Sequence, residues 1–324
     1  MLSKNEWDPL KTVIVGVADD AKIPELDISL RTINYADHTD ESTIPVGNYP
    51  QQVIDEANED LNTLAEFLSS QGVDVLRPDK SYVPNYYNYC PRDTVVVTDD
   101  LILASPTALV ARRNEWQASE SNLSKFGDVT VASNPGTENL YNLECVSNPD
   151  ILSLNNTAPC FDAANILRAN DDLYYLVSNT GNKAGAEYLQ SLLPNKKIHL
   201  LEDIYSYIHI DSTIAFLREG LMLLNPARIK SKEQLPESLQ GWEVIWAPEP
   251  VDIGHYPGYC NASVWVSINL FSVNPNLVIL EEHQHNLRKE LEKYNIECAM
   301  LPMRHARTLG GCFHCVTLDV ERTD

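Results

Sequence analysis

The chain has 324 residues, of which 44% are apolar and 22% are charged. A chain of this length and composition can bury a full hydrophobic core, which excludes a mostly disordered protein. Its 46 acidic and 24 basic residues give a formal net charge of −22. Because a uniformly acidic surface repels phosphate groups, we expect neither nucleic acid nor an anionic membrane as a partner. We expect one domain that spans residues 1–324.

Hydropathy and cysteine content predict a cytoplasmic protein. No run approaches the roughly 18 apolar residues of a membrane span, and the N-terminal stretch lacks the features of a secretory or transit peptide. The seven cysteines are an odd number, spread thinly over the chain. A disulfide framework shows a denser and even pattern. A reducing compartment and one reactive thiol fit these cysteines better.

A loose repeat of short strands runs along the chain. Each copy has a short apolar or alternating run that ends in Pro, Asp or Asn, which is typical of a half-buried strand. The five copies comprise residues 72–79, 127–134, 196–203, 241–249 and 295–302.

Helices and hairpins recur around these strands. Amphipathic patterns predict helices over residues 51–72, 183–193 and 281–294. Paired apolar runs across Asp, Asn or Gly turns predict hairpins over residues 93–105, 165–178, 212–226 and 263–282.

The predicted unit is therefore helix, strand, loop and hairpin, about five times over. Such units either surround an axis, with helices outside and strand ends around a central site, or form an ordinary mixed α/β domain. The pattern alone leaves both open. Residues 21–49 and 133–158 are the most loop-like regions, and we expect both to be insertions into the one domain.

The loops before the hairpins carry the chemically suggestive residues. They are residues 91–93 (PRD), 161–165 (FDAAN), 209–213 (HIDST), 261–263 (NAS) and 310–315 (GGCFHC). If the units surround an axis, these loops face one another. One cysteine, one histidine and three aspartates would then line a single pocket.

This set of side chains suits covalent attack on a cationic, planar, nitrogen-rich carbon. A thiolate is a strong nucleophile, and a histidine can move protons near neutral pH. Rigid carboxylates accept paired hydrogen bonds from a guanidinium group. The same carboxylates would repel phosphate, and the chain has neither a Walker A nor a GxGxxG motif. The sequence therefore indicates guanidine chemistry rather than phosphoryl transfer.

The segment GGCFHCVTLDVER at residues 310–322 resembles the C-terminal signature of the arginine:glycine amidinotransferase family. PRD, FDAAN and HIDST, followed by LLNPARI, match the other family motifs in the same order, and NEWDPLKTVIVG is similar to the first strand of the family. The resemblance spans nearly the whole chain. It implies the pentein fold, a five-bladed, pseudo-symmetric α/β propeller of ββαβ-type modules around a central active site.

The resemblance also implies a role for each motif residue. Cys315 corresponds to the nucleophile and His209 to the general acid/base, while Asp162 corresponds to the aspartate that pairs with the histidine and holds the guanidinium. The substrate-binding positions are Asp93 and Asp211 for the guanidinium, Arg228 for the substrate carboxylate and Ser263 for the amino-acid end. Because residues i and i+2 of a strand point the same way, we expect Asp211 to lie beside His209 on a strand.

The mechanism implied by the resemblance is ping-pong. Cys315 attacks the guanidinium carbon of L-arginine, His209 protonates the departing amine, and ornithine leaves an amidino-cysteine behind. An acceptor, which is glycine, lysine or another small primary amine, then takes the amidino group. The reaction needs no metal or organic cofactor, and the binding partners of the enzyme are small molecules. Because members of the family are often dimers, the resemblance also implies a homodimer.

Other interpretations stay open on the sequence. In an arginine deiminase or dihydrolase of the same fold, water replaces the acceptor amine, and an acidic propeller could also serve as a non-enzymatic protein scaffold. Cys312 and Cys315 form a CxxC pair, which is typical of a redox site or of half a zinc site. No second CxxC pair is present to complete a zinc site, so we interpret Cys312 as a packing residue. The tyrosine-rich run over residues 82–89 either borders the pocket or packs as a loop.

Two departures from the family pattern bear on specificity. Ala262 and Ser263 stand where the family has two serines, and Ile208 stands where the glycine enzymes often have methionine. Changes of this kind in a pocket typically alter substrate preference by about 1–3 kcal/mol. We therefore expect arginine as the donor and leave the acceptor open.

Overall fold

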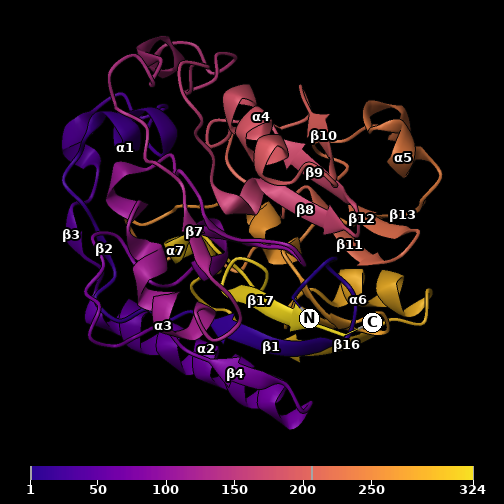
Figure 1. Cartoon of the computed structure of the whole chain (residues 1–324). Coiled ribbons are helices and arrows are strands. Elements are labelled where there is room, and N and C mark those ends of the chain that lie inside the picture. Colours follow the sequence, from indigo (N-terminus) through magenta and orange to yellow (C-terminus); the bar gives the residue numbers. More distant parts are fainter. Residues whose placement is uncertain (1, 206, 324) are drawn as a thin grey trace.

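The computed structural model describes residues 2–205 and 207–323, and five three-stranded sheets dominate it (Figure 1). In each sheet the central strand pairs antiparallel with one neighbour and parallel with the other. The sheets are β17 (Thr317–Arg322), β1 (Leu10–Val15) and β4 (Asp74–Leu76); β5 (Val95–Val97), β6 (Ile102–Ala104) and β7 (Val129–Val131); β8 (Ile166–Ala169), β9 (Asp172–Leu176) and β10 (Lys197–Leu201); β11 (Ile214–Arg218), β12 (Leu221–Leu224) and β13 (Glu243–Trp246); and β14 (Phe271–Asn274), β15 (Leu277–Glu281) and β16 (Glu297–Leu301). We call these sheets blades 1 to 5, in this order.

A helix connects the two parallel strands of every blade, because parallel neighbours need a crossover. The crossover helices are α2 (Gln51–Ser70), α3 (Glu120–Leu123), α4 (Lys183–Leu192), α5 (Glu237–Gln240) and α6 (His285–Glu292). The further helices are α1 (Ile28–Ile33) and α7 (Ala306–Leu309), with 3-10 helices η1 (Glu41–Thr43), η2 (Pro91–Asp93), η3 (Val110–Arg112), η4 (Glu115–Ser119), η5 (Leu143–Val146), η6 (Ala163–Asn165), η7 (Lys232–Gln234) and η8 (Val264–Ile268).

The blades form a closed ring. A separate cluster of buried apolar side chains lies between each pair of neighbouring blades: between blades 1 and 2, 2 and 3, 3 and 4, 4 and 5, and 5 and 1. The last strand, β17, pairs with the first strand, β1, so the two ends of the chain complete blade 1 together and lie side by side (Figure 1). The five-bladed pentein arrangement is thereby confirmed, and the ordinary mixed α/β domain is excluded.

The longest helix shows how the sequence pattern determines the packing. The apolar face of α2 is buried against blades 1 and 5, with Leu61, Leu64 and Leu68 fully enclosed. Gly72 follows the helix with φ +82°, a left-handed conformation that favours glycine. The chain then turns directly into β4, as its predicted strand required.

Three local predictions were wrong. The predicted helix over residues 281–294 begins only at His285, because Glu281 is the buried end of β15, where its carboxylate accepts hydrogen bonds from the backbone N–H of His283 and the side chain of Gln284. In the predicted hairpin over residues 263–282, the segment 264–268 forms η8 rather than a strand. His209 and Asp211 lie in a loop, not on a strand, so their proximity does not come from the alternation of strand side chains.

Both loop-like insertions contain short elements and pack together. In residues 21–49, β2 (Lys22–Ile23) pairs with β3 (Gly47–Asn48), and α1 is capped by the Asp27 side chain. In residues 133–158, the Ser153 hydroxyl donates to the Thr32 carbonyl over 2.6 Å, which attaches the second insertion to α1. The paired insertions lie beside the central pocket, since Ile33 and Asn34 line it.

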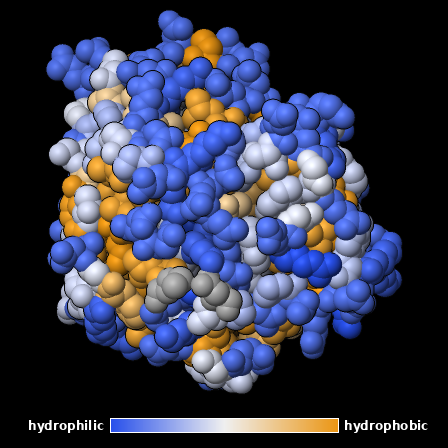
Figure 2. Space-filling view, turned by 45° about the vertical axis from the view of Figure 1, so that its right-hand side comes forward, coloured by the Kyte–Doolittle hydropathy of each residue, from blue (hydrophilic) through white to orange (hydrophobic). Residues whose placement is uncertain are grey.

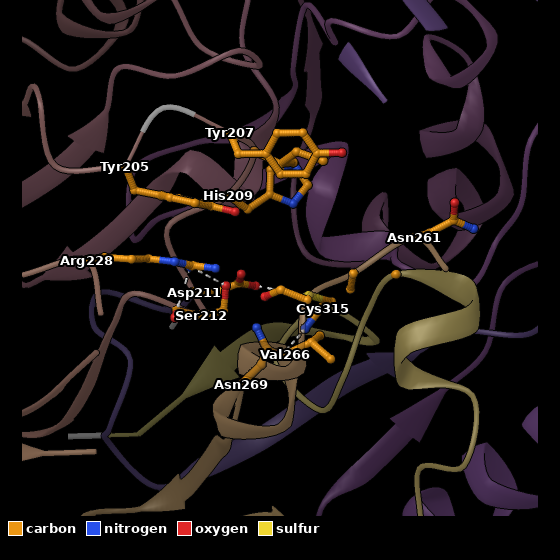
Figure 3. Close-up of a pocket in the computed structure, with 14 residues that line it drawn as sticks. Tyr205, Tyr207, His209, Asp211, Ser212, Arg228, Asn261, Val266, Asn269 and Cys315 are labelled. Carbon is orange, nitrogen blue, oxygen red and sulfur yellow. Dashed lines mark hydrogen bonds between the residues drawn. The ribbon is translucent and has the colours of Figure 1, made fainter. Parts of the chain in front are cut away.

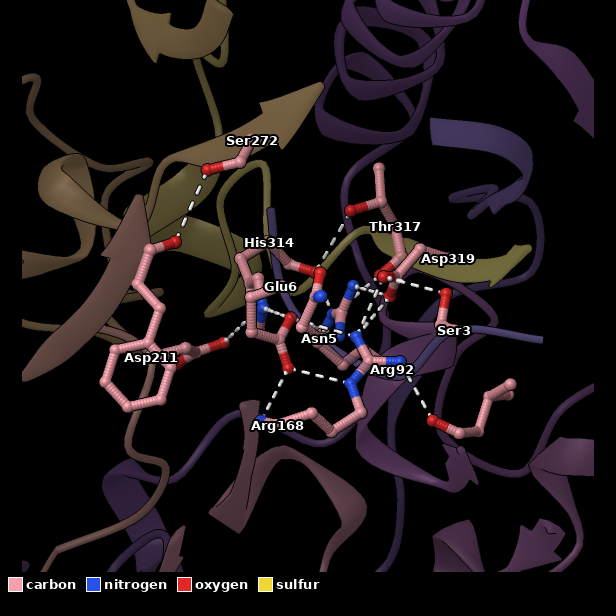
Figure 4. Close-up of polar contacts among 12 residues, drawn as sticks. Ser3, Asn5, Glu6, Arg92, Arg168, Asp211, Ser272, His314, Thr317 and Asp319 are labelled. Atoms are coloured by element: carbon pink, nitrogen blue, oxygen red, sulfur yellow. Dashed lines mark hydrogen bonds and ion pairs between the residues drawn. The ribbon is translucent and has the colours of Figure 1, made fainter. Parts of the chain in front are cut away.

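A buried network of ionised side chains occupies the centre of the ring (Figure 4). The Asp319 carboxylate, on β17, accepts hydrogen bonds from Arg92, Arg168 and Arg322 at 2.6–2.8 Å. Glu6, just before β1, accepts a second pair of bonds from Arg168 at 2.8 and 2.9 Å. Because these residues come from blades 1, 2 and 3, the network joins three blades.

The exposed surface is mixed in polarity. No helix among the described residues is long and apolar enough to cross a membrane. Hydrophilic residues predominate on the face in Figure 2, between smaller apolar patches. The large apolar side chains that are most exposed, Val83 and Leu143, lie far apart in the chain at 62% and 60% exposure. Single apolar residues of this kind are normal on a surface.

The network makes Asp319 a strong test of the fold. Asp319→Ala would leave three buried guanidinium groups short of their shared counter-charge, and we expect it to lower the free energy of unfolding by about 3–5 kcal/mol. Denaturant titration would measure the loss. The control is Glu290→Ala, which removes an exposed ion pair with Lys293 and should cost less than about 1 kcal/mol. Equal losses in the two variants would contradict a structural role for the network.

Candidate active site

The predicted site residues gather around two adjoining cavities at the centre of the ring. The first cavity is lined by Cys315, Asp211, Arg228 and Ser263 (Figure 3). The second is lined by Asp93 and Asp162. His209 lines both cavities and stands between the two groups. All seven predicted residues are thus brought together, from loops of all five blades.

Cys315 lies in the loop between α7 and β17, and two glycines shape that loop. Gly310 has φ +85°, and a Cβ atom on Gly311 would lie 2.5 Å from the Cys90 sulfur. The Cys315 thiol is 3% exposed and donates to Asp211 Oδ2 over 3.1 Å. The loop therefore holds the sulfur at the floor of the first cavity, against a carboxylate.

His209 lies between two carboxylates. Its Nε2 is 3.0 Å from Asp162 Oδ2, and its Nδ1 is 3.6 Å from Asp93 Oδ1. The other oxygen of Asp162 accepts the backbone N–H of Ala108 over 3.0 Å. Asp162 is fixed in this way, so it can orient the imidazole toward the pocket.

Asp93 is hydrogen-bonded at one oxygen only, and its other oxygen has the looser 3.6 Å ion pair with His209. Arg112 donates to Asp93 Oδ2 over 2.7 Å and to Glu115 over 2.7 Å. Asp93 Oδ1 is buried without a hydrogen-bond partner among the described residues. A buried unpaired carboxylate oxygen is costly unless a ligand pairs with it, so Asp93 offers an acceptor to a ligand with N–H groups.

Asp211 is supported from behind by His314. The imidazole lies with Nδ1 3.1 Å from Asp211 Oδ2 and Nε2 3.3 Å from Glu6 Oε2. Through Glu6 the support extends to Arg168 and the central network (Figure 4). The carboxylate nearest the nucleophile is thus connected to the buried network that joins three blades.

Arg228 forms the cationic end of the first cavity. Its Nη1 donates to the Ser212 carbonyl, the Ser212 hydroxyl and the Thr213 hydroxyl at 2.7–3.1 Å. Its guanidinium stacks on the Tyr205 ring, with 3.6 Å between the guanidinium carbon and the ring centroid. Ser263 is exposed at the rim. Only one nitrogen of Arg228 is used by these bonds, which leaves the others for an anionic group.

The clustered charges change the protonation of the reactive groups. Burial opposes the charged form of His209, but Asp93, Asp162 and Asp211 outweigh it and raise its pKa to about 9. The neighbouring Cys90 thiol, burial and the Asp211 carboxylate raise the pKa of the Cys315 thiol well above its usual value. Burial also raises the pKa of Asp93. A carboxylate-lined pocket of this kind stabilises a cationic ligand.

The pKa of Asp211 is lowered rather than raised. Burial alone would raise its pKa, but the hydrogen bond and charge of His314, together with His209, hold the pKa well below the usual range. Asp211 therefore stays ionised beside the sulfur over the whole neutral range.

Sequence patterns did not reveal the supporting residues. His314 and Asn269 act through contacts between blades, and Arg112 and Tyr205 act on residues about 20 positions away in the chain, none of which local spacing encodes. The tyrosine run at residues 82–89 was left open between two roles, and it fills both: Tyr86 and Tyr87 line the second cavity and are buried in the packed loop.

Known proteins resemble this chain closely, although no protein-family model matches it. The chain is 40% identical over 334 residues to inosamine-phosphate amidinotransferase 1 of Streptomyces glaucescens, with 98% of this chain and 96% of that protein covered. It is 31% identical to the L-arginine:L-lysine amidinotransferase of Pseudomonas savastanoi pv. phaseolicola, with 99% and 94% covered. The solved structure of an inosamine-phosphate amidinotransferase from Streptomyces griseus matches with a TM-score of 0.95 and 38% identity, over 100% of this chain and 97% of that one. The chain therefore belongs to the amidinotransferase family and is an enzyme of the pentein fold.

Proposed function

We propose that the enzyme transfers the amidino group of L-arginine to a primary amine through an amidino-Cys315 intermediate. The observation that carries this proposal is the convergence of one thiol, one imidazole and three carboxylates on a pocket that ends in Arg228. The carboxylates of the enzyme can accept hydrogen bonds from the guanidinium group of substrate arginine, and the side chain of Arg228 can bind the carboxylate of the substrate. The L-arginine:L-lysine relative supports arginine as the donor.

In the first half-reaction the Cys315 thiol gives its proton to solvent as the cationic substrate binds, and the resulting thiolate attacks the guanidinium carbon. The bound guanidinium adds a positive charge between Asp93 and Asp211, which offsets the carboxylates that raise the pKa of the thiol. His209 carries a proton at neutral pH and gives it to the departing nitrogen as the C–N bond breaks. Ornithine leaves, and the amidino group stays on the sulfur as a cation.

In the second half-reaction the acceptor amine enters the same pocket. Its lone pair attacks the amidino carbon, neutral His209 takes the proton that the amine loses, and the C–S bond breaks to return the thiolate. Charge balances in both directions, because each half-reaction moves one proton between His209 and the reacting nitrogen. Asp162 keeps the imidazole oriented for both transfers.

We further propose that the acceptor is an amine that also carries an anionic group. Among the described residues Arg228 is the arginine that lines the first cavity, so it can serve the donor carboxylate and then the anionic group of the acceptor in turn. The inosamine-phosphate relative, at 40% identity, supports a phosphorylated amino-cyclitol above glycine or lysine. Incubation with arginine and each candidate amine, read by mass spectrometry for the new guanidino product, would identify the acceptor.

Water could also take the place of the amine. The enzyme incubated with arginine alone should release about one equivalent of ornithine and then stop. Steady release of citrulline, ammonia or urea would instead indicate a hydrolase.

We also propose that the enzyme is a cytoplasmic homodimer. Its seven unpaired cysteines support a reducing compartment, and light scattering would test the dimer.

Cys315 should be the nucleophile and Cys312 a packing residue. We expect Cys315→Ala to abolish ornithine release and the amidine-mass adduct, because no other thiol lines the first cavity among the described residues. Intact-protein mass spectrometry after mixing with arginine would show the adduct. Cys312→Ala is the matched control, since its thiol is fully buried in the core cluster between blades 5 and 1. A dead Cys312→Ala beside an active Cys315→Ala would reverse the assignment.

Arg228 should act on the carboxylate of the donor. Arg228→Ala should lower kcat/KM for arginine by about 10- to 100-fold, which is the usual worth of a charged hydrogen bond. Agmatine lacks the carboxylate, so its kcat/KM should change little. Steady-state kinetics with both donors would measure the difference. Equal losses on the two donors would rule out a carboxylate contact.

The carboxylates around His209 should be visible in its titration. In the free enzyme the imidazole signal should titrate with a midpoint of about 9, assigned by difference from His209→Gln in an NMR spectrum with labelled histidine. Asp162→Asn removes one carboxylate that stabilises the imidazolium, so the midpoint should fall. A wild-type midpoint at or below the usual value for histidine would contradict the electrostatic origin of the shift.

A further inference from the structure

Asn269 has a hydrogen-bond donor that no described residue satisfies. It follows η8 in blade 5, and its side chain is 1% exposed. Its Oδ1 accepts the backbone N–H of His314 over 2.9 Å and of Cys315 over 3.2 Å. Its Nδ2 is buried and has no hydrogen-bond partner among the described residues.

The orientation of this amide is fixed by its partners. Both backbone groups are donors, so they require the carbonyl oxygen of Asn269 and not its nitrogen. The oxygen therefore faces the nucleophile loop, and the nitrogen faces the first cavity, on the side where Ser212 and Asp211 lie (Figure 3). Asn269 thus holds the backbone of Cys315 with one atom and presents a donor to the ligand with the other.

The chemistry of the ligand decides what this donor can bind. A guanidinium group has N–H donors and no acceptor, so it can satisfy the unpaired oxygen of Asp93 but not the unpaired nitrogen of Asn269. The carboxylate of arginine has acceptors only. Of the two ends of the donor substrate, therefore, only the carboxylate end can pair with Asn269.

We propose that Asn269 is a specificity-determining residue whose Nδ2 binds the carboxylate of arginine together with Arg228. In the second half-reaction the same nitrogen binds the anionic oxygen of the acceptor. This inference rests on arginine being the donor, as proposed above. It adds a neutral donor to the cationic end of the cavity and links substrate recognition directly to the nucleophile loop, because one side chain contacts both.

The test compares two donors that differ only in the carboxylate. Wild-type enzyme is first mixed with arginine and weighed; a missing adduct would defeat the proposed function and not this inference. The kcat/KM ratio of arginine to agmatine is then measured for Asn269→Ala. Loss of the loop contacts should slow both donors, but loss of the donor nitrogen should lower the ratio by about tenfold or more. Asn269→Ser replaces the alanine variant if that variant does not fold, since its short hydroxyl cannot reach both the loop and the ligand.

Two controls separate this contact from indirect effects. Asn261→Ala changes an asparagine of the same cavity whose Nδ2 is already bonded to Tyr49 and to the Thr308 carbonyl, both at 2.7 Å, and it should leave the ratio unchanged. Asn269→Asp keeps an oxygen for the loop but replaces the donor with a charge, and it should lower the ratio further. An unchanged ratio in Asn269→Ala, or a fall in the aspartate variant alone, would overturn the proposal.

Discussion

The pairing of β17 with β1 is the constraint on which the site depends. Cys315 lies two residues before β17, so the position of the sulfur relative to the other four blades is set by the strand that closes the ring. Asp319, on that strand, collects guanidinium groups from blades 1, 2 and 3. The closing strand therefore carries both the nucleophile and the charge that joins the blades. A nucleophile placed elsewhere would not be coupled to closure in this way.

The site concentrates acidic groups, and buried nitrogen donors that hydrogen-bond them make this concentration possible. Three carboxylates in one pocket would repel each other and take up protons unless positive groups offset them. Arg112 supports Asp93, and His314 supports Asp211, each through a buried hydrogen bond. The free oxygen of Asp93 and the sulfur-facing side of Asp211 then point at the ligand. Without substrate, the remaining negative charge raises the pKa of both Cys315 and His209, so the free enzyme holds a thiol and an imidazolium. The positive charge of the incoming guanidinium then offsets the carboxylates.

Local signals in the sequence predicted the repeat and the loops that carry the motifs, whereas the closed ring and the roles of the seven motif residues followed from the resemblance to a known family. Strand alternation, turn residues and the stripe on α2 are short-range patterns, and the site motifs recur at equivalent places in successive blades. The sequence did not predict Arg112, His314 or Asn269, since their partners lie far away in the chain or in another blade. The late start of α6 was also not predicted, because it depends on tertiary structure. Glu281 is buried as the last residue of β15, and this burial overrides the helix propensity of the segment.

The unpaired atoms of the two cavities give the pocket a polarity. Asp93 presents an acceptor at one end, while Asn269 and Arg228 present donors at the other. A ligand must therefore carry N–H groups at one end and oxygen acceptors at the other, with the reacting carbon near Cys315 and His209. Arginine satisfies this pattern, and so does an amine that carries a phosphate or carboxylate. An amine without such a group would leave the buried nitrogen of Asn269 unpaired, at the cost that buried polar groups incur when they lack a partner. The same polarity that orients the donor thus selects the acceptor, because a ping-pong enzyme must bind both in one pocket.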